Sequence, residues 1–368
     1  IHIVEPGLED AVREAILAGS LRAATLPEPA DVFVIAVPTP FKAQKKPDLR
    51  FIESAALAIA PVLKAGDLVI LESTSPVGTT EMLAEWLFAN RCDLTFPQTL
   101  GGEADIKVAY CPERVLPGKT MYELVANERV VGGMSEACSQ MAVDFYGGFV
   151  QGQCVVTNAR TAEMCKLTEN AFRDVNIAFA NELSVICDEI DVSVWELIKL
   201  ANYHPRVDIL QPGPGVGGHC IAVDPWFIVD SAPASAKIIR LAREINDSKP
   251  HYVISKVKNE IRGLKAPVIA CLGLAFKPNV DDLRESPALE IVKRLAEDKV
   301  GDLMIVEPNI QSLPLTLNHY ANVKFTGLNI AIAKADVILL LVDHKEFCQI
   351  DHALLIGRKI IDTRGIFQ

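Results

Sequence analysis

Short apolar runs alternate with helical patterns near both ends of this 368-residue chain, and a long helical stretch separates the two zones. In the first zone the runs include 31–37 (DVFVIAV), 67–71 (DLVIL) and 130–133. Apolar runs that alternate with helices predict buried, parallel strands joined by crossover helices. The first zone is therefore predicted to form an α/β domain.

The middle of the chain has a different pattern. The segment 161–189 contains neither Gly nor Pro, which favours one long helix. The α/β alternation then returns with VIACLGLAF, a helix at 287–297, DLMIVEP, DVILLLVDH and KIIDTRG. We therefore predict two Rossmann-like, doubly wound α/β domains, 1–154 and 264–368, joined by a central helical domain, 155–263.

Charge and cysteine content exclude several classes of protein. With 36 Lys and Arg against 47 Asp and Glu, the net charge is −11, which argues against broad binding of nucleic acids or anionic membranes. The apolar runs are far shorter than the ~18 residues of a membrane span. Nine cysteines without a Cys-x-x-Cys pair favour a reducing compartment, so we expect a cytoplasmic protein.

Three loops follow predicted strands, where doubly wound sheets bind their ligands. They are 38–40, 72–78 and 276–278. Thr79 or Thr80 is predicted to cap the helix after the second loop, leaving backbone N–H groups for an anion. Turn and cap chemistry alone accounts equally well for each loop.

The string 213–218 (GPGVGG) formally matches the dinucleotide-binding pattern Gly-x-Gly-x-x-Gly. No strand–loop–helix context surrounds it, so we do not interpret it as a cofactor turn. Its glycines predict either close approach of the backbone to a ligand or a tight turn that presents Cys220.

Cys220 follows this string directly, with His219 before it and Asp224 four residues later. A thiol on a glycine-rich loop beside a carboxylate is a candidate nucleophile, although an isolated cysteine is more often a small buried hydrophobe. The cysteines and the seven histidines lack zinc-ligand spacing, so we predict no metal site.

Lys166, Asn170 and Arg173 share one face of the predicted long helix. An ammonium, an amide and a guanidinium together can stabilise an oxyanion or bind a phosphate. A solvated polar stripe is the alternative interpretation.

Two loop pairs are ambiguous in the same way. Glu113 with Arg114 fits either a site or a surface ion pair, and His204 with Arg206 likewise fits either a site or the protein surface.

The order of several strings carries a family resemblance. EPGL (5–8), VPTP, ESTSPVG, CPERVLPG, AEMCKLTENAFRDVNIAFANEL, NYHPRVDILQPGPGVGGHCIAVDPWF and LAFKPNVDDLRESPA stand in this order along the whole chain. Together they resemble the UDP-glucose/GDP-mannose dehydrogenase family, the UDP-sugar 6-dehydrogenases. The strings around 111–118, 202–207 and 217–220 resemble most the bacterial branch that acts on UDP-N-acetyl-D-mannosamine.

The resemblance implies NAD-dependent, four-electron oxidation of a UDP-sugar at C6 through a thiohemiacetal and a thioester on Cys220. Lys166 and Asn170 would stabilise the oxyanion, Glu113 would act in thioester hydrolysis, and Asp224 and Thr74 would lie near a catalytic water. UDP-N-acetyl-D-mannosamine is the expected substrate, for bacterial surface polysaccharide. UDP-glucose or another UDP-hexosamine is the alternative.

The resemblance also implies binding residues and a homodimer through the central helices. The implied substrate contacts are Arg114, Val115, Arg173, His204, Arg206, Gly217, Lys277 and Arg364. The implied NAD contacts are Thr39, Thr74, Thr80 and Arg284, although the phosphate that Arg284 binds could belong to either ligand.

Family members place a βαβ unit with a glycine turn before the segment that matches 1–8. This unit and its connection span about 45 residues and are expected to be missing here. A catalytically silent, UDP-sugar-binding or dimerisation fragment is therefore a further alternative.

Overall fold

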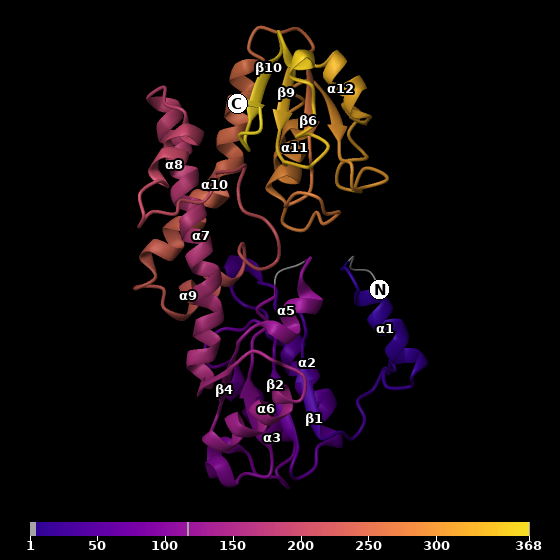
Figure 1. Cartoon of the computed structure of the whole chain (residues 1–368), viewed down its shortest axis with the longest axis vertical. Helices are drawn as coiled ribbons and strands as arrows, with labels where there is room; N and C mark the ends of the chain where they lie inside the picture. Colours follow the sequence, from indigo (N-terminus) through magenta and orange to yellow (C-terminus); the bar gives the residue numbers. More distant parts are fainter. Residues whose placement is uncertain (1–4, 116–117, 368) are drawn as a thin grey trace. The chain divides into compact units, whose positions relative to one another are not determined.

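The computed structural model describes residues 5–115 and 118–367 and forms two compact units (Figure 1). The first takes in the chain up to Glu169 together with 226–233, and the second takes in 170–225 and 234–368. The division into three domains at 154 and 263 remains a prediction. In the part of the chain that is described, no helix is long and apolar enough to cross a membrane.

The first unit consists mainly of a sheet and its covering helices. Its elements are α1 (Leu8–Leu17), β1 (Val32–Ile35), η1 (Ala43–Lys45), α2 (Arg50–Ile59), η2 (Ala60–Val62), β2 (Leu68–Leu71), α3 (Thr79–Asn90), α4 (Pro97–Leu100), η3 (Gly101–Glu103), β3 (Lys107–Tyr110), α5 (Thr120–Ala126), β4 (Arg129–Gly133), α6 (Glu136–Gly147), β5 (Cys154–Asn158) and the start of α7 (Ala159–Glu189).

The strand order in this sheet is β1-β2-β3-β4-β5. All neighbours are parallel except β3 and β4, which are antiparallel. The prediction of a purely parallel sheet was therefore wrong at one position. A buried strand is apolar whichever way it runs, so the sequence pattern carried no information on direction.

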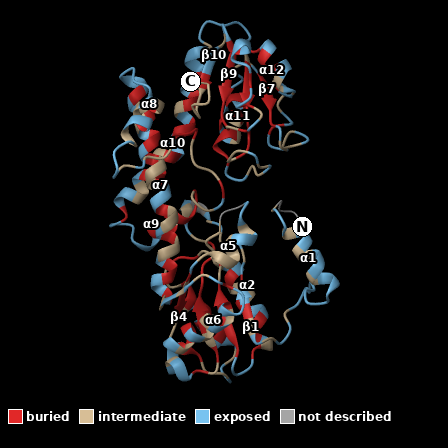
Figure 2. Cartoon of the chain, in the orientation of Figure 1, coloured by how far each residue is buried: buried red, intermediate tan, exposed pale blue. Residues whose placement is uncertain are grey.

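Alternate side chains of the first sheet reach opposite layers. Val69 of β2 packs in a core with Ile52 of α2, whereas Ile70 packs in a second core with Tyr146 of α6. Two-sided burial explains why β2 is a continuous apolar run. Figure 2 shows these strands as buried ribbon (red).

The second unit contains the helical part and the other sheet. It continues α7 and adds α8 (Val194–Ala201), the start of α9 (Asp224–Ser231), α10 (Lys237–Glu260), β6 (Val268–Leu272), α11 (Pro287–Glu297), β7 (Asp302–Val306), β8 (Val323–Phe325), α12 (Leu328–Lys334), β9 (Val337–Leu340), η4 (His352–Leu355) and β10 (Lys359–Asp362).

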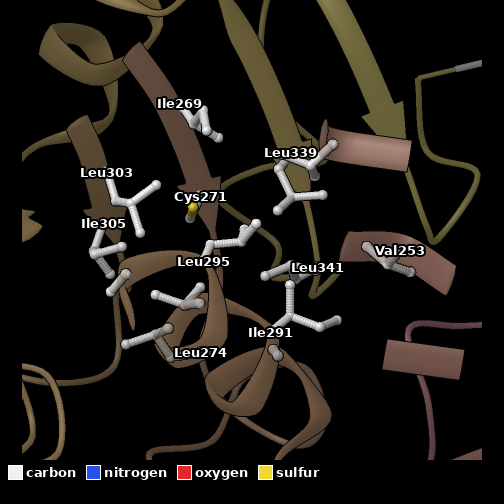
Figure 3. Packing of buried hydrophobic residues seen from close by; sticks show 14 of the residues in the cluster. Val253, Ile269, Cys271, Leu274, Ile291, Leu295, Leu303, Ile305, Leu339 and Leu341 are labelled. Carbon is white, nitrogen blue, oxygen red and sulfur yellow. The ribbon is translucent and has the colours of Figure 1, made fainter. Parts of the chain in front are cut away.

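The second sheet is wholly parallel, in the order β10-β9-β6-β7-β8. Cys271 of β6 packs with Leu295 of α11 and Val253 of α10 (Figure 3). The next residue, Leu272, belongs to the core on the opposite face, with Ile332 of α12. This two-layered core confirms the α/β fold predicted for this region.

The predicted helix 287–297 coincides with α11. Ser286 accepts a hydrogen bond on its hydroxyl from the N–H of Leu289, and Pro287 occupies the first helical position. A serine cap followed by proline fixes where a helix begins, because proline has no N–H to satisfy there.

Candidate active site

Cys220 lies half-buried on a turn of the second unit that leads into α9. The carbonyl oxygen of Cys220 accepts hydrogen bonds from the N–H groups of Val223, at 2.9 Å, and Asp224, at 2.8 Å. Just before it, Gly218 has φ +83°, a left-handed conformation that favours glycine. The glycine string thus forms a tight turn that presents Cys220.

The same glycines bring the turn against another part of the chain. A Cβ on Gly217 would lie 2.5 Å from the carbonyl oxygen of Glu285, and one on Gly218 would lie 2.9 Å from the ring of Phe276. The N–H of Gly218 also donates to the carbonyl oxygen of Arg284, at 3.2 Å. The glycines were expected to let the backbone approach a ligand closely. In the structure, the segment 276–285 of the protein itself packs closely against them.

Asn170 and Asp224 meet beside this turn. The amide Nδ2 of Asn170 donates to Oδ2 of Asp224 at 2.5 Å, and the Asp224 residue is only 3% exposed. Because the Asp224 N–H bonds the Cys220 carbonyl, this pair connects α7 to the cysteine turn.

A buried polar network anchors the start of the turn. Asn181 of α7 accepts the N–H of Gly213 at 2.8 Å and donates to Asn246 of α10 at 2.9 Å. Asn246 in turn donates to Asp174, which pairs with Arg243 at 2.6 Å. Sequence analysis missed these residues, although Asn170, Asp174 and Asn181 recur at spacings of four and seven on one helix.

Two buried side chains hold the loop that carries Lys277. The carboxylate of Glu307 accepts the N–H groups of Leu274, at 2.7 Å, and Ala275, at 3.1 Å. His344 accepts the N–H of Asn279 on Nδ1 at 2.9 Å, so its Nε2 is the protonated nitrogen, which donates to Glu307 at 3.0 Å. Both ends of the loop are thus fixed.

Arg364 also lies close to the turn. A Cβ on Gly213 would lie 2.7 Å from its guanidinium. The same guanidinium pairs with Asp343 at 2.7 Å. The second unit therefore brings together the candidates Cys220, Asn170, Asp224, Gly217, Arg284 and Arg364, and through Phe276 it places the Lys277 loop beside them.

The remaining catalytic candidates lie in the first unit. The ammonium of Lys166 donates to the carbonyl oxygen of Glu113 at 2.5 Å. Arg114 forms an ion pair with Glu169 at 2.7 Å. The start of α7 therefore holds the 111–115 segment, whose Val115 is half-buried. An approach of Lys166 to Cys220 remains a prediction.

Further charged groups lie close to the 111–115 segment. Tyr146 donates to the carboxylate of Glu72 at 2.6 Å, and Arg129 lies 3.7 Å from the same group. Burial raises the pKa of Glu72, and the nearby Glu113 carboxylate adds to this rise. Burial also raises the pKa of the Cys111 thiol, to about 11, so this cysteine stays protonated near neutral pH.

The expected free helix N-terminus is occupied by a side chain. The N-cap residue of α3 is Gly78, with φ 97°, so neither threonine is the cap. The carboxylate of Glu163 accepts the N–H groups of Gly78, at 2.6 Å, and Thr80, at 2.8 Å, and also the Thr80 hydroxyl, at 2.6 Å. The prediction of a free anion site was wrong because a buried carboxylate from α7 already satisfies the donors.

Arg173, His204 and Arg206 are exposed on the helical part of the second unit. The ring nitrogen Nδ1 of His204 accepts the backbone N–H of Arg206 at 3.3 Å. Asn202 closes this loop through two hydrogen bonds with the backbone of Ile209. Substrate contacts by these cations remain predictions.

Three family models match the chain in order. They describe the NAD binding domain (residues 1–150), the central domain (160–248) and the UDP binding domain (270–368) of the UDP-glucose/GDP-mannose dehydrogenase family. The chain belongs to this family. It is an NAD-dependent nucleotide-sugar dehydrogenase, as its sequence motifs predicted.

Two curated relatives are similar over nearly the whole chain. The NDP-N-acetyl-D-galactosaminuronic acid dehydrogenase of Ralstonia solanacearum is 63% identical over 367 residues, which cover 100% of this chain and 86% of the relative. The UDP-N-acetyl-D-mannosamine dehydrogenase of Campylobacter jejuni is 61% identical over 351 residues, covering 95% of this chain and 86% of the relative.

A solved structure has the same fold. The UDP-D-ManNAc dehydrogenase of Pyrococcus horikoshii superposes with a TM-score of 0.87 at 37% identity, covering 100% of this chain and 86% of that one. This similarity confirms two α/β sheets with a helical part between them in sequence.

The loops after β1 and β2 lie at the carboxyl ends of neighbouring parallel strands, and NAD contacts by Thr39 and Thr74 remain predictions. The Thr39 hydroxyl donates to the Thr74 carbonyl oxygen at 2.5 Å, which joins the two loops at the carboxyl ends of their strands. The α3 N-terminus does not fit a cofactor diphosphate, because Glu163 occupies it. A cofactor contact by Thr80 remains a prediction and would require Glu163 to move.

Proposed function

We propose that this dehydrogenase oxidises the C6 alcohol of UDP-N-acetyl-D-mannosamine to a carboxylate, using Cys220 as a covalent nucleophile, for bacterial surface polysaccharide. The observation that carries the proposal is the turn that presents a half-buried thiol beside Asn170 and Asp224. The relatives from Campylobacter jejuni and Pyrococcus horikoshii support this choice of substrate.

NAD⁺, when bound, supplies the hydride acceptor for both oxidations. After the first, the Cys220 thiolate adds to the aldehyde carbon, giving a thiohemiacetal whose oxyanion the Asn170 amide and the Lys166 ammonium stabilise. The second oxidation converts the thiohemiacetal to a thioester. Water then attacks the acyl carbon, the sulfur leaves as thiolate, and the uronic acid is released.

Three side chains are proposed to bind and activate the water that hydrolyses the thioester. Glu113 takes a proton from the attacking water as general base, while Asp224 and Thr74 orient a water molecule. The contact of Lys166 with the Glu113 carbonyl supports this arrangement, because it ties the 111–115 segment to α7. Neutral Cys111 is no competing nucleophile, since burial raises its pKa to about 11.

The substrate's diphosphate and sugar require cations, which an overall acidic chain supplies locally. We propose that the substrate is bound by Arg114, Val115, Arg173, His204, Arg206, Gly217, Lys277 and Arg364. Thr39, Thr74, Thr80 and Arg284 are the proposed NAD contacts. Arg114 and Arg364 already form ion pairs, with Glu169 and Asp343, so substrate phosphates would compete with these carboxylates.

A substrate comparison tests the proposal. The enzyme, expressed from its complete reading frame, is offered UDP-N-acetyl-D-mannosamine, UDP-N-acetyl-D-galactosamine and UDP-glucose at saturating NAD⁺. We expect two NADH per UDP-N-acetyl-D-mannosamine and at least tenfold higher kcat/KM for that sugar. The Ralstonia relative makes the galactosamine sugar the second candidate, and faster turnover of it or of UDP-glucose would overturn the substrate.

We also propose that a second copy of the chain covers the apolar face of α7. Phe172, Phe179 and Ile186 are 45–68% exposed and recur along one side of this helix, and Ile190, 62% exposed, follows its last residue. Phe179→Glu is expected to convert a dimer into monomers in light scattering, while Phe88→Glu on α3 leaves the mass unchanged. An unaltered dimer in Phe179→Glu would refute the interface.

The proposed location is the cytoplasm. None of the nine cysteines, all of which lie among the described residues, forms a disulfide, which suits a reducing compartment.

A further inference from the structure

A cavity of about 290 Å³ lies within the second unit and reaches the start of the glycine string that leads to Cys220. It is lined by helices α7, α8 and α10 and by the segment at the end of β10. Its polar wall includes Ser184, Asp188, Lys249, Tyr252 and Lys256. None of these residues has a part in the oxidation proposed above.

Lys249 is the unusual member of this wall. It is only 6% exposed, although its ammonium carries three N–H donors. Among the described residues, its one hydrogen-bond acceptor is the Ser184 hydroxyl, and its ammonium lies 4.7 Å from the centre of the Tyr252 ring. Burial lowers the pKa of Lys249 to about 8, which reflects a cation without a carboxylate in hydrogen-bond contact.

The other charges of the cavity are already satisfied. From α7, the Asp188 carboxylate pairs with Lys256 at 2.7 Å and also accepts the Tyr252 hydroxyl. From the end of β10, the Asp362 carboxylate accepts three backbone N–H groups of residues 364–367, at 2.7–2.8 Å. Among the described residues of the wall, Lys249 is therefore the buried cation that has no carboxylate in hydrogen-bond contact.

Aromatic rings form the rest of the wall. Trp195 of α8 and Phe367 line the cavity with Tyr252. Its size is close to the lower limit of small-molecule sites, ~300 Å³. The Lys249 ammonium has N–H donors left to bind an anionic oxygen, and the rings favour an organic body over an inorganic ion.

We propose that this cavity binds a small aryl or alkyl carboxylate, whose oxygens accept hydrogen bonds from Lys249 and whose body packs against Trp195, Tyr252 and Phe367. Pro212 and Gly213, at the start of the segment that leads to Cys220, line the same cavity. An occupant therefore contacts the chain that presents the nucleophile.

Calorimetry with benzoate as the probe tests this site, with benzamide as its uncharged isostere and inorganic phosphate as the purely ionic one. Saturating UDP fills the nucleotide site throughout. We expect benzoate to bind at least tenfold more tightly than either benzamide or phosphate. Equal binding of benzoate and benzamide, tighter binding of phosphate, or no binding of benzoate would overturn the proposal.

Two variants test whether the Lys249 ammonium is the charge that binds benzoate. Lys249→Met keeps the unbranched stem but removes the ammonium, and it is expected to weaken benzoate binding at least tenfold. Lys258→Met is the matched control on α10, because Lys258 is exposed and pairs with Asp298 outside the cavity. Benzoate binding to Lys249→Met with wild-type affinity would refute the site.

The wild-type protein provides an independent check, should the variant fold poorly. Benzoate affinity is expected to fall about tenfold between pH 7 and pH 9, because Lys249 loses its proton over this range. The other titratable groups that line the cavity are Asp188, Asp362, Tyr252 and Lys256. A flat profile over this range would contradict a role for Lys249.

Discussion

The side-chain amide of Asn170 lies 2.5 Å from the Asp224 carboxylate, and the N–H of Asp224 bonds the Cys220 carbonyl oxygen at 2.8 Å. An amide has two N–H donors, so one can fix the orientation of Asn170 while the other makes the contact proposed with the substrate oxyanion. A donor held in this way before the reaction needs no reorganisation when negative charge develops.

Removal of this amide should slow the chemical step. Asn170→Ala is expected to lower kcat by about 10²–10³-fold, the usual effect of one lost oxyanion donor, with a smaller change in KM. Asn90→Ala is the control, because the exposed Asn90 side chain donates to the Trp86 carbonyl oxygen of its own helix, α3. Steady-state NADH formation measures both variants, and a wild-type kcat in Asn170→Ala would exclude the amide from catalysis.

The packing of the glycine turn should be intolerant of a methyl group. Gly217→Ala would place a Cβ 2.5 Å from the Glu285 carbonyl oxygen, so the Cys220 turn must shift. A displacement of about 1 Å can cost on the order of 100-fold in rate. Gly327→Ala should leave kcat unchanged, since the φ of Gly327 is −76° and no described atom lies within 4 Å of the added Cβ. Equal kcat values for the two variants would contradict this packing.

Glu307 should contribute to stability in a pH-dependent way. Burial raises its pKa, but hydrogen bonds from His344 and from the backbone N–H groups outweigh that effect, so its pKa is below the usual value. The stabilisation is therefore complete above the unfolded pKa of about 4.3 and is lost as the pH falls through the folded value.

Glu307→Gln should accordingly be less stable than wild type at pH 7, by about 1–3 kcal/mol, and the difference should shrink below pH 4. Urea unfolding at several pH values measures this. A difference that is independent of pH would mean that the charge of Glu307 is not responsible.

The charge of Lys249, unlike that of Glu307, should lower the stability of the folded protein at neutral pH. Its folded pKa of about 8 is below the unfolded 10.5, so the native state binds fewer protons between these values and wild-type stability rises with pH across that window. The 2.5-unit difference corresponds to about 3 kcal/mol at pH 7. Lys249→Met is expected to gain up to this amount at pH 7 and progressively less toward pH 10; a loss of stability at pH 7 would refute this.

The fold could be predicted from the sequence wherever a local signal was strong. The Ser286–Pro287 cap set the start of α11, and the lack of Gly and Pro over 161–189 predicted α7. The antiparallel β4 could not be predicted, because strand direction depends on the path of the connecting chain rather than on apolar content.

The site was predictable only in part, and for a similar reason. Cys220 could be identified as a candidate because it directly follows the glycine string 213–218 in the sequence. Glu163 and Glu307 gave no comparable signal, because each is one acidic residue among many until folding brings it to its backbone donors. Long-range satisfaction of buried polar groups is a property of the tertiary structure.

The covalent role of Cys220 is tested most directly by mass spectrometry of the enzyme during turnover. Glu113→Gln is expected to slow thioester hydrolysis, so the variant, mixed with the UDP-sugar and NAD⁺, should carry the uronyl group on the peptide that contains Cys220. The adduct should be absent without NAD⁺ and in Glu113→Gln/Cys220→Ala. An adduct on another cysteine, or uronic acid formed at the wild-type rate by Cys220→Ala, would contradict the account.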